Sequence, residues 1–174
     1  PSIVNNPHLV KKVVFPVKML PLSTILGAFV VHLILLLIAG LTLAFLGSLT
    51  PSNLWKLPFA VLYLFAFTTG LALLASSFNV FVRDTQVVEQ VVISIWCWVT
   101  PIIWPLSRVP SDWQWLMMLN PLTLPLEMYR SSLLGTAIGV STVLYTMATM
   151  IICLFLITAW KISSSLQPRF ADAI

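Results

Sequence analysis

The segment WVTPIIWPLSRVP, from Trp98 to Pro110, is followed by LNPLTLPLEMYR, from Leu119 to Arg130. Prolines cut residues 105–135 into pieces of about ten residues, half of what a helix needs to cross the ~30 Å hydrocarbon core of a membrane. Non-helical backbone at membrane depth survives only where protein or a water-filled cavity covers it. We therefore expect two short re-entrant helices, Asp112 to Leu119 and about Leu124 to Leu134, that dip in from the outer face and return to it.

The composition excludes a water-facing surface. The chain has 174 residues, of which 59% are hydrophobic and 8% are charged, and its mean hydropathy is +1.01. Soluble domains carry about 25% charged residues, so the composition predicts an all-α integral membrane protein. The net charge of +4 is too small and too scattered for nucleic-acid binding. Cys97 and Cys153 lie in apolar runs, where cysteines usually pack rather than pair.

Four apolar runs surround the broken segment and are expected to span the membrane: residues 22–46, 57–78, 87–104 and 137–160. Thr50 followed by Pro51 fits an N-cap with proline at the first helical position. Ser111 with Gln114 fits a capping box before the first short helix. His32 is the only ionisable residue of the first run. We expect it to bond a backbone carbonyl, with a substrate contact or a proton relay as the alternative.

Positive charges predict the orientation, because cytoplasmic segments carry more lysine and arginine. Four spans put both ends of the chain on one side. That side holds six of these residues and the other holds three: Lys11, Lys12, Lys18, Arg83, Lys161 and Arg169 against Lys56, Arg108 and Arg130. Residues 1–21, the loop with Arg83 and Asp84, and the polar tail 161–174 are therefore expected to be cytoplasmic. Residues 1–21 read as a basic segment at the membrane interface or as an ordinary positive loop.

No catalytic pattern is present in the sequence. It contains no Walker lysine loop, no HExxH and no Ser-His-Asp set that spacing would suggest. Two histidines and five acidic residues leave little for metal ligation. We therefore expect movement or binding rather than an enzyme activity, and no cofactor in this chain.

Three features are candidates for recognition. The basic segment and the Arg83–Asp84 loop face the same side, where a soluble partner could dock, although the pair could equally cap neighbouring helices. Glu127 and Arg130, three residues apart, are most simply an ion pair, with a polar gate or a phosphate contact as the sharper alternative. The third feature is an aromatic cluster, which suits sugar rings as well as a lipid belt: Trp96, Trp98, Trp104, Trp113, Trp115 and Tyr129.

Within this cluster, Trp96 and Trp98 are two residues apart, so they cannot share one helix face. At least one of the two should point into the helix bundle. Sequence alone leaves open which ring that is.

Several of these motifs resemble a known family in their order and spacing. FVRD (residues 81–84), TPIIWPLSRVP (100–110), LNPLTLPLEMYR (119–130) and a terminal FADAI (170–174) together look like the permease subunit of type-2 ABC exporters for polysaccharides. That branch includes exporters of O-antigen, capsule and teichoic acid. NPHLVKKVVFPVKMLPL, residues 6–22, resembles the cytoplasmic segment before the third span of the family. The resemblance extends across essentially all of the chain.

The resemblance implies an architecture and a set of partners. A full subunit would have six spans, so this chain would be a single transmembrane domain that lacks its N-terminal part. The subunit would form a homodimer in the bacterial inner (plasma) membrane, with its C-terminus in the cytoplasm. A separate cytoplasmic ABC ATPase would bind ATP and Mg²⁺. The dimer would be surrounded by membrane lipids and would enclose a channel for a lipid-linked glycan. The two short gate helices would close this channel at the outer face.

The resemblance also assigns roles to residues. Residues 6–20 would be the coupling segment on the ATPase, with these residues in contact: Asn6, Leu9, Lys11, Lys12, Phe15, Pro16 and Lys18. Arg83 and Asp84 match the family's Arg-Asp pair at the cytoplasmic end of its fourth span. The channel and gate would be lined by Trp96, Trp98, Trp104, Trp113, Trp115, Glu127, Tyr129 and Arg130.

Three alternatives stay open at this point. The first is a drug or antibiotic efflux permease of the same fold. The second is a membrane-embedded enzyme acting on lipid-linked sugars, with Glu127, Arg130 and His32 as its polar groups. The third is a structural membrane subunit that binds partners and moves nothing.

Overall fold

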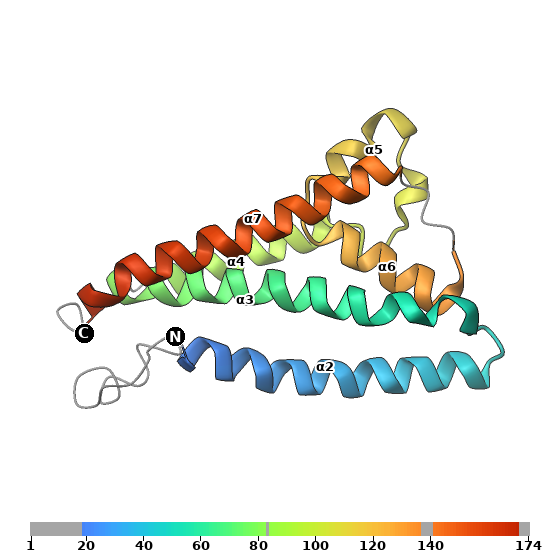
Figure 1. The fold of residues 1–174 in the computed structure, drawn as a ribbon, viewed down its shortest axis with the longest axis horizontal. Coiled ribbons are helices and arrows are strands. Elements are labelled where there is room, and N and C mark those ends of the chain that lie inside the picture. The colour runs from blue at the N-terminus through green and yellow to red at the C-terminus, as the bar shows by residue number, and fades with distance from the viewer. Residues whose placement is uncertain (1–18, 83, 137–140, 171–174) are drawn as a thin grey trace.

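Long helices dominate the fold (Figure 1). The computed structural model describes residues 19–82, 84–136 and 141–170, and within them it contains α-helices and 3-10 helices but no strand. The helices α2 (Met19–Phe45), α3 (Leu57–Phe81) and α7 (Thr142–Leu166) are the longest, and the 3-10 helix η1 (Pro51–Lys56) leads directly into α3. By length and composition, α2, η1 with α3, and α7 can each cross a membrane. The all-α fold predicted from composition is confirmed.

Helix α3 is the centre of the bundle. It packs against α2, α7, α4 (Thr85–Val99) and α6 (Thr123–Leu134). A Cβ placed on Gly70 would lie 2.9 Å from Cε1 of Phe155, so α7 lies too close to α3 for a larger residue to fit without a shift. Further along, the Ser77 hydroxyl donates to the Ser163 hydroxyl oxygen at 3.0 Å. Close approach at small residues and interhelical hydrogen bonds are what hold helices together in lipid.

Helix α4 is shorter than the span predicted over residues 87–104. It ends at Val99, and Thr100 is extended, with φ −78° and ψ 137°. Pro101 explains this end, because a proline disfavours the helical conformation in the residue before it. Fifteen residues rise about 22 Å, less than the ~30 Å core. The described residues therefore contain three helices of spanning length and not the four that were expected.

The two ends of the described chain lie at the same end of the bundle (Figure 1). There, Val80 and Phe170 form a buried cluster with the partly buried Leu20 and Leu166. This agrees with the expectation that the segments flanking the bundle share one side. Helix α7 continues past the predicted end at residue 160 to Leu166, so Lys161 is helical and not part of a tail. Residues 137–140, where this span was expected to begin, lie outside the described residues.

Two predicted caps differ from the structure. Thr50 does occupy the N-cap position of η1 before Pro51, but its side chain makes no capping hydrogen bond. The capping box at Ser111 is wrong, because Ser111 is already the first residue of α5 (Ser111–Met118) and Pro110 precedes it. Gln114 Nε2 instead donates to the Val109 carbonyl at 3.0 Å. The two short helices themselves lie within one residue of the predicted bounds.

Candidate functional site: a helical hairpin and its polar anchors

The helices α5 and α6 form a hairpin between the end of α4 and the start of α7 (Figure 1). At its base, the Thr50 amide, between α2 and α3, donates to the Leu133 carbonyl at 3.1 Å. At its tip, Asn120 bonds Trp96 of α4, whose ring packs edge-on against Phe67 near the middle of α3. The hairpin therefore reaches from the start of α3 to about its middle, as the re-entrant prediction requires.

Asn120 holds the tip with three hydrogen bonds. Its Oδ1 accepts from Trp96 Nε1 at 3.0 Å and from the Leu122 amide at 3.1 Å. Its Nδ2 donates to Thr100 Oγ1 at 2.9 Å, and the Thr100 hydroxyl donates to the Trp96 carbonyl at 2.7 Å. Buried polar groups are costly unless they are bonded. These bonds therefore fix the bend at Asn120–Pro121 to the end of α4.

Glu127 and Arg130 anchor the irregular segment that connects α4 to α5. Arg130 Nη1 lies 2.6 Å from Glu127 Oε1, so the ion pair predicted from their spacing is confirmed. Arg130 Nη2 also donates to the carbonyls of Pro101 and Ile102, each at 2.6 Å, and Glu127 Oε1 accepts from the Leu106 amide at 3.3 Å. Glu127 is only 7% exposed. The pair thus supplies hydrogen-bond partners for backbone groups that lie outside any helix. Irregular backbone at membrane depth requires such partners.

A histidine in α2 is bonded to α6. His32 Nε2 and the Tyr129 hydroxyl lie 2.9 Å apart in a hydrogen bond, and the two rings meet edge-on. The prediction that His32 bonds a backbone carbonyl is wrong, because its partner is the Tyr129 hydroxyl. The carbonyls of a continuous helix are already bonded within it, whereas the Tyr129 hydroxyl lies within reach.

Two more side-chain contacts join α6 to its other neighbours. Lys56 Nζ, at the end of η1, donates to Ser131 Oγ at 3.1 Å. The Tyr145 hydroxyl of α7 donates to Met128 Sδ at 2.9 Å. Polar side chains from α2, η1 and α7, and backbone groups of the segment after α4, therefore all converge on α6.

The predicted aromatic residues divide between the bundle and its surface. Trp96 bonds the hairpin tip, whereas Trp98 is 75% exposed. The prediction that at least one of this pair points into the bundle is confirmed. Trp104, after α4, is half-buried, and both Trp113 and Trp115 of α5 are exposed.

The predicted ATPase contacts cannot be placed in the same way. Arg83 lies outside the described residues, and so do the coupling residues Asn6, Leu9, Lys11, Lys12, Phe15, Pro16 and Lys18. Asp84 is exposed at the N-cap position of α4, and its side chain makes no capping hydrogen bond.

Asn120, Thr100 and Lys56 belong to the site, although no motif in the sequence singled them out for this role. In the sequence, Asn120 is recognisable only as the residue before Pro121, where a helix is expected to end. The available signal was its chemistry, because an amide inside an apolar segment needs partners. Its position does not reveal those partners, which lie 20 and 24 residues earlier in the chain.

The arrangement is suited to holding a hairpin in place rather than to bond-making chemistry. Across residues 19–82, 84–136 and 141–170, no three histidine, cysteine, aspartate or glutamate side chains are grouped to hold a metal ion. The single ion pair of these ranges is engaged with backbone groups. What the site offers is a short, well-anchored element inside a bundle of long apolar helices.

Comparison with known proteins agrees with this picture. A family model described as "ABC-2 type transporter" matches residues 2–134. The chain belongs to the ABC-2 type transporter family. With three described helices able to span a bilayer, it is a membrane protein.

Curated relatives of this ABC-2 family chain share a single name. Two proteins of Klebsiella pneumoniae, named "O-antigen export system permease protein RfbA", are 25% and 27% identical to it, and one of Myxococcus xanthus with the same name is 28% identical. Each alignment covers 99% of this chain. It covers 66%, 66% and 67% of the relatives, so the chain spans about two thirds of their length.

Proposed function

We propose that the chain is part of the membrane-spanning permease subunit of an ATP-driven exporter, which moves a lipid-linked polysaccharide across the bacterial inner membrane. The observation that carries this proposal is the similarity, along 99% of the chain, to proteins named as O-antigen export permeases. The ABC-2 match over residues 2–134 supports the same class. A separate cytoplasmic ABC ATPase supplies the energy, so the permease itself is not an enzyme.

The proposed exporter is a homodimer with its C-terminus in the cytoplasm. The segment from Asn6 to Leu20 contacts the ATPase, and the Arg83–Asp84 loop faces the same side. This orientation is supported by the excess of basic residues on that side. It is also supported by the cluster of Leu20, Val80 and Phe170, which places these parts of the chain together.

In this proposal the α5–α6 hairpin is the outer gate. Helix α2 follows the coupling segment directly, and His32 bonds Tyr129 of the hairpin. A push on the coupling segment therefore has a packed route to the gate through α2, as a rigid-body shift of helices. Glu127 and Arg130 hold the shape of the gate, and Trp96 positions its tip. The exposed rings of Trp98, Trp113 and Trp115 are left to contact the glycan or its lipid.

The test uses the full-length gene expressed with its chromosomal neighbours. We expect a nucleotide-binding protein to co-purify with the permease in stoichiometric amount. Deleting the gene should remove the surface polysaccharide and leave its lipid-linked form inside the cell, and the full-length gene should restore export. Altered antibiotic susceptibility with a normal surface glycan would instead indicate an efflux permease. Turnover of lipid-linked sugars without any ATPase would indicate a membrane enzyme.

A further inference from the structure

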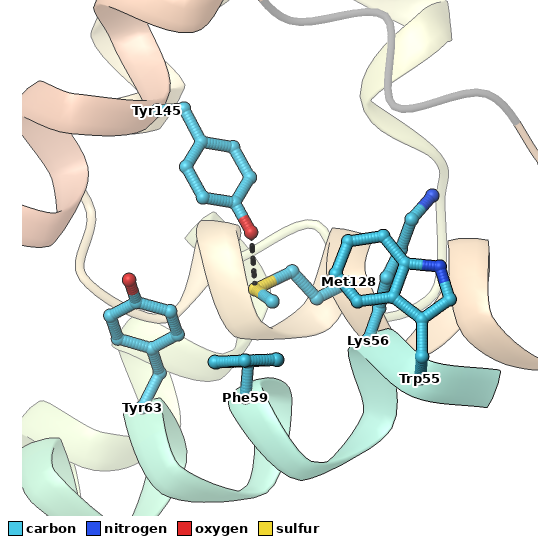
Figure 2. A pocket seen from close by; sticks show the side chains of 6 residues that line it. All are labelled: Trp55, Lys56, Phe59, Tyr63, Met128 and Tyr145. Carbon is cyan, nitrogen blue, oxygen red and sulfur yellow. Dashed lines mark hydrogen bonds between the residues drawn. The ribbon is translucent and has the colours of Figure 1, made fainter. Parts of the chain in front are cut away.

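A second feature of the structure is a pocket of about 380 Å³ between η1, α3, α6 and α7 (Figure 2). It is lined by Trp55, Lys56, Phe59, Tyr63, Met128 and Tyr145. Trp55, Phe59 and Tyr63 are spaced four residues apart, so they follow one face of the helix. The pocket therefore extends about 12 Å along this face, from η1 into α3.

The walls of this pocket leave few free hydrogen-bonding groups. The Tyr63 hydroxyl is bonded to Thr149 Oγ1 at 3.0 Å. The Tyr145 hydroxyl donates a hydrogen bond to Met128 Sδ, as Figure 2 shows. A sugar ring needs several partners for its hydroxyls, whereas an alkyl chain needs none. The lining therefore suits an acyl chain better than a glycan.

Lys56 supplies a charge at the η1 end of the pocket. Its Nζ donates to Ser131 Oγ at 3.1 Å and lies 5.8 Å from the centre of the Trp55 ring. The one ion pair of the described ranges joins Glu127 to Arg130, so no carboxylate of these ranges neutralises Lys56. An ammonium group has three donors, and two of them are left for an anion.

The η1 end of the pocket also lies where a lipid headgroup is expected. It lies at the end of α3 opposite to the cluster of Val80 and Phe170, so it marks one boundary of a helix long enough to span a membrane. Tryptophan and lysine are favoured at such boundaries, where an apolar body and a polar tip are both accommodated.

We propose that this pocket binds an anionic phospholipid, with its phosphate on Lys56 and an acyl chain along Phe59, Tyr63 and Met128. An anionic phospholipid fits this pocket because Lys56 is a cation without a carboxylate partner among the described residues, and the apolar slot beside it suits an acyl chain. The proposal requires that α3 spans a membrane, but it does not depend on what is transported. Its failure would therefore leave the proposed export function unaffected.

The experiment is native mass spectrometry of the full-length permease, released from nanodiscs that contain phosphatidylglycerol or phosphatidylcholine. Lys56→Gln removes the charge, and Lys56→Arg keeps it. Arg108→Gln is the matched control, because it removes an exposed charge predicted to face the same side. One lysine near a membrane surface contributes about a fivefold preference for an anionic lipid. We expect Lys56→Gln to lose about this factor for phosphatidylglycerol, with little change for phosphatidylcholine, and Lys56→Arg and Arg108→Gln to behave as the wild type.

Several outcomes would overturn the proposal. Equal retention of phosphatidylglycerol by the wild type and Lys56→Gln would remove the role of the charge. The absence of any retained lipid on the wild type would indicate that another segment of the full-length protein covers the pocket. A clear preference for a polyisoprenyl phosphate over phosphatidylglycerol, measured in the same way, would assign the pocket to a transport intermediate instead of a membrane lipid.

Discussion

The helices α6 and α4 have similar lengths, twelve and fifteen residues, and opposite burial. Helix α6 buries seven of its residues, among them Thr123, Glu127, Ser131 and Ser132. Helix α4 consists mainly of valine, isoleucine and tryptophan and buries none. In a water-soluble protein the apolar helix would be the buried one. In lipid, an apolar side chain gains little from leaving the solvent, whereas an unsatisfied polar group costs several kcal/mol. The polar helix is therefore the one enclosed by protein.

This contrast separates two kinds of residue. Side chains that anchor α6 should determine whether the subunit folds, because their polar groups have no other partner. Side chains on the bare surface of α4 should leave folding almost unchanged and act, if at all, on what lies outside the subunit.

The largest effect is expected for Arg130→Met. This change leaves Glu127 buried without its cation and frees the carbonyls of Pro101 and Ile102. Breaking a buried pair from one side costs about 3–5 kcal/mol. We expect a marked loss of folded protein after heating in detergent, measured by fluorescence-detected size-exclusion chromatography.

Two variants sharpen this result. Arg108→Met removes an exposed arginine that has no carboxylate partner among the described residues, and it should behave as the wild type. Adding Glu127→Gln to Arg130→Met removes the unpaired charge and should recover part of the loss. A single variant Arg130→Met as heat-resistant as the wild type would mean that the pair does not hold the hairpin.

The next effect is expected for Asn120→Ala. The change leaves Trp96 Nε1 and the Leu122 amide without their acceptor and Thr100 Oγ1 without its donor. Leaving buried polar groups unsatisfied costs about 1–3 kcal/mol, so the same heating assay should show a smaller loss than with Arg130→Met. Asn53→Ala is the control, because no hydrogen bond of the Asn53 side chain is found among the described residues. Equal behaviour of the two alanine variants would contradict the anchoring of the hairpin tip.

A smaller effect is expected for the bond between α2 and α6. A double-mutant cycle with His32→Leu and Tyr129→Phe isolates this hydrogen bond. Hydrogen bonds between helices in a membrane protein average about 0.6 kcal/mol, so the interaction energy should be near this value. Additive effects of the two changes would show that the helices are held by packing alone, and the proposed route from the coupling segment to the gate would lose its polar link.

Short-range patterns predicted several features of the molecule. Glu127 and Arg130 lie one helical turn apart, so their ion pair follows from helix geometry alone. The opposite directions of Trp96 and Trp98 follow in the same way. The lengths of the apolar runs predicted α2, α3 and α7, because lipid-facing helices need no amphipathic pattern. The length of α4 was overestimated, since hydropathy counts apolar residues whether or not Pro101 lets them continue a helix.

Contacts between distant parts of the chain were not predictable in this way. His32 and Tyr129 are 97 residues apart, and Trp96 and Asn120 are 24 apart. Which polar group meets which is decided by how the helices pack, and many pairings would satisfy the same residues. The capping box at Ser111 failed for a local reason, because α5 begins one residue earlier than the pattern requires and Pro110 occupies the N-cap position.

The smallest effect on folding is expected for Trp98→Ala, and its comparison with Trp96→Ala is the sharpest test of the contrast between α6 and α4. Trp96 donates to Asn120 and packs on Phe67, so its removal should lower heat resistance. Trp98 projects from the bundle, and its removal should change stability by no more than about 0.5 kcal/mol. In the proposed exporter, the amount of polysaccharide on the cell surface at equal permease levels then decides what Trp98 faces. Impaired export with normal folding would place it on the path of the glycan or at the partner subunit, whereas unchanged export would make it a lipid-facing residue. A loss of folding as large as for Trp96→Ala would instead mean that the surface of α4 is not bare, and the contrast with α6 would fail.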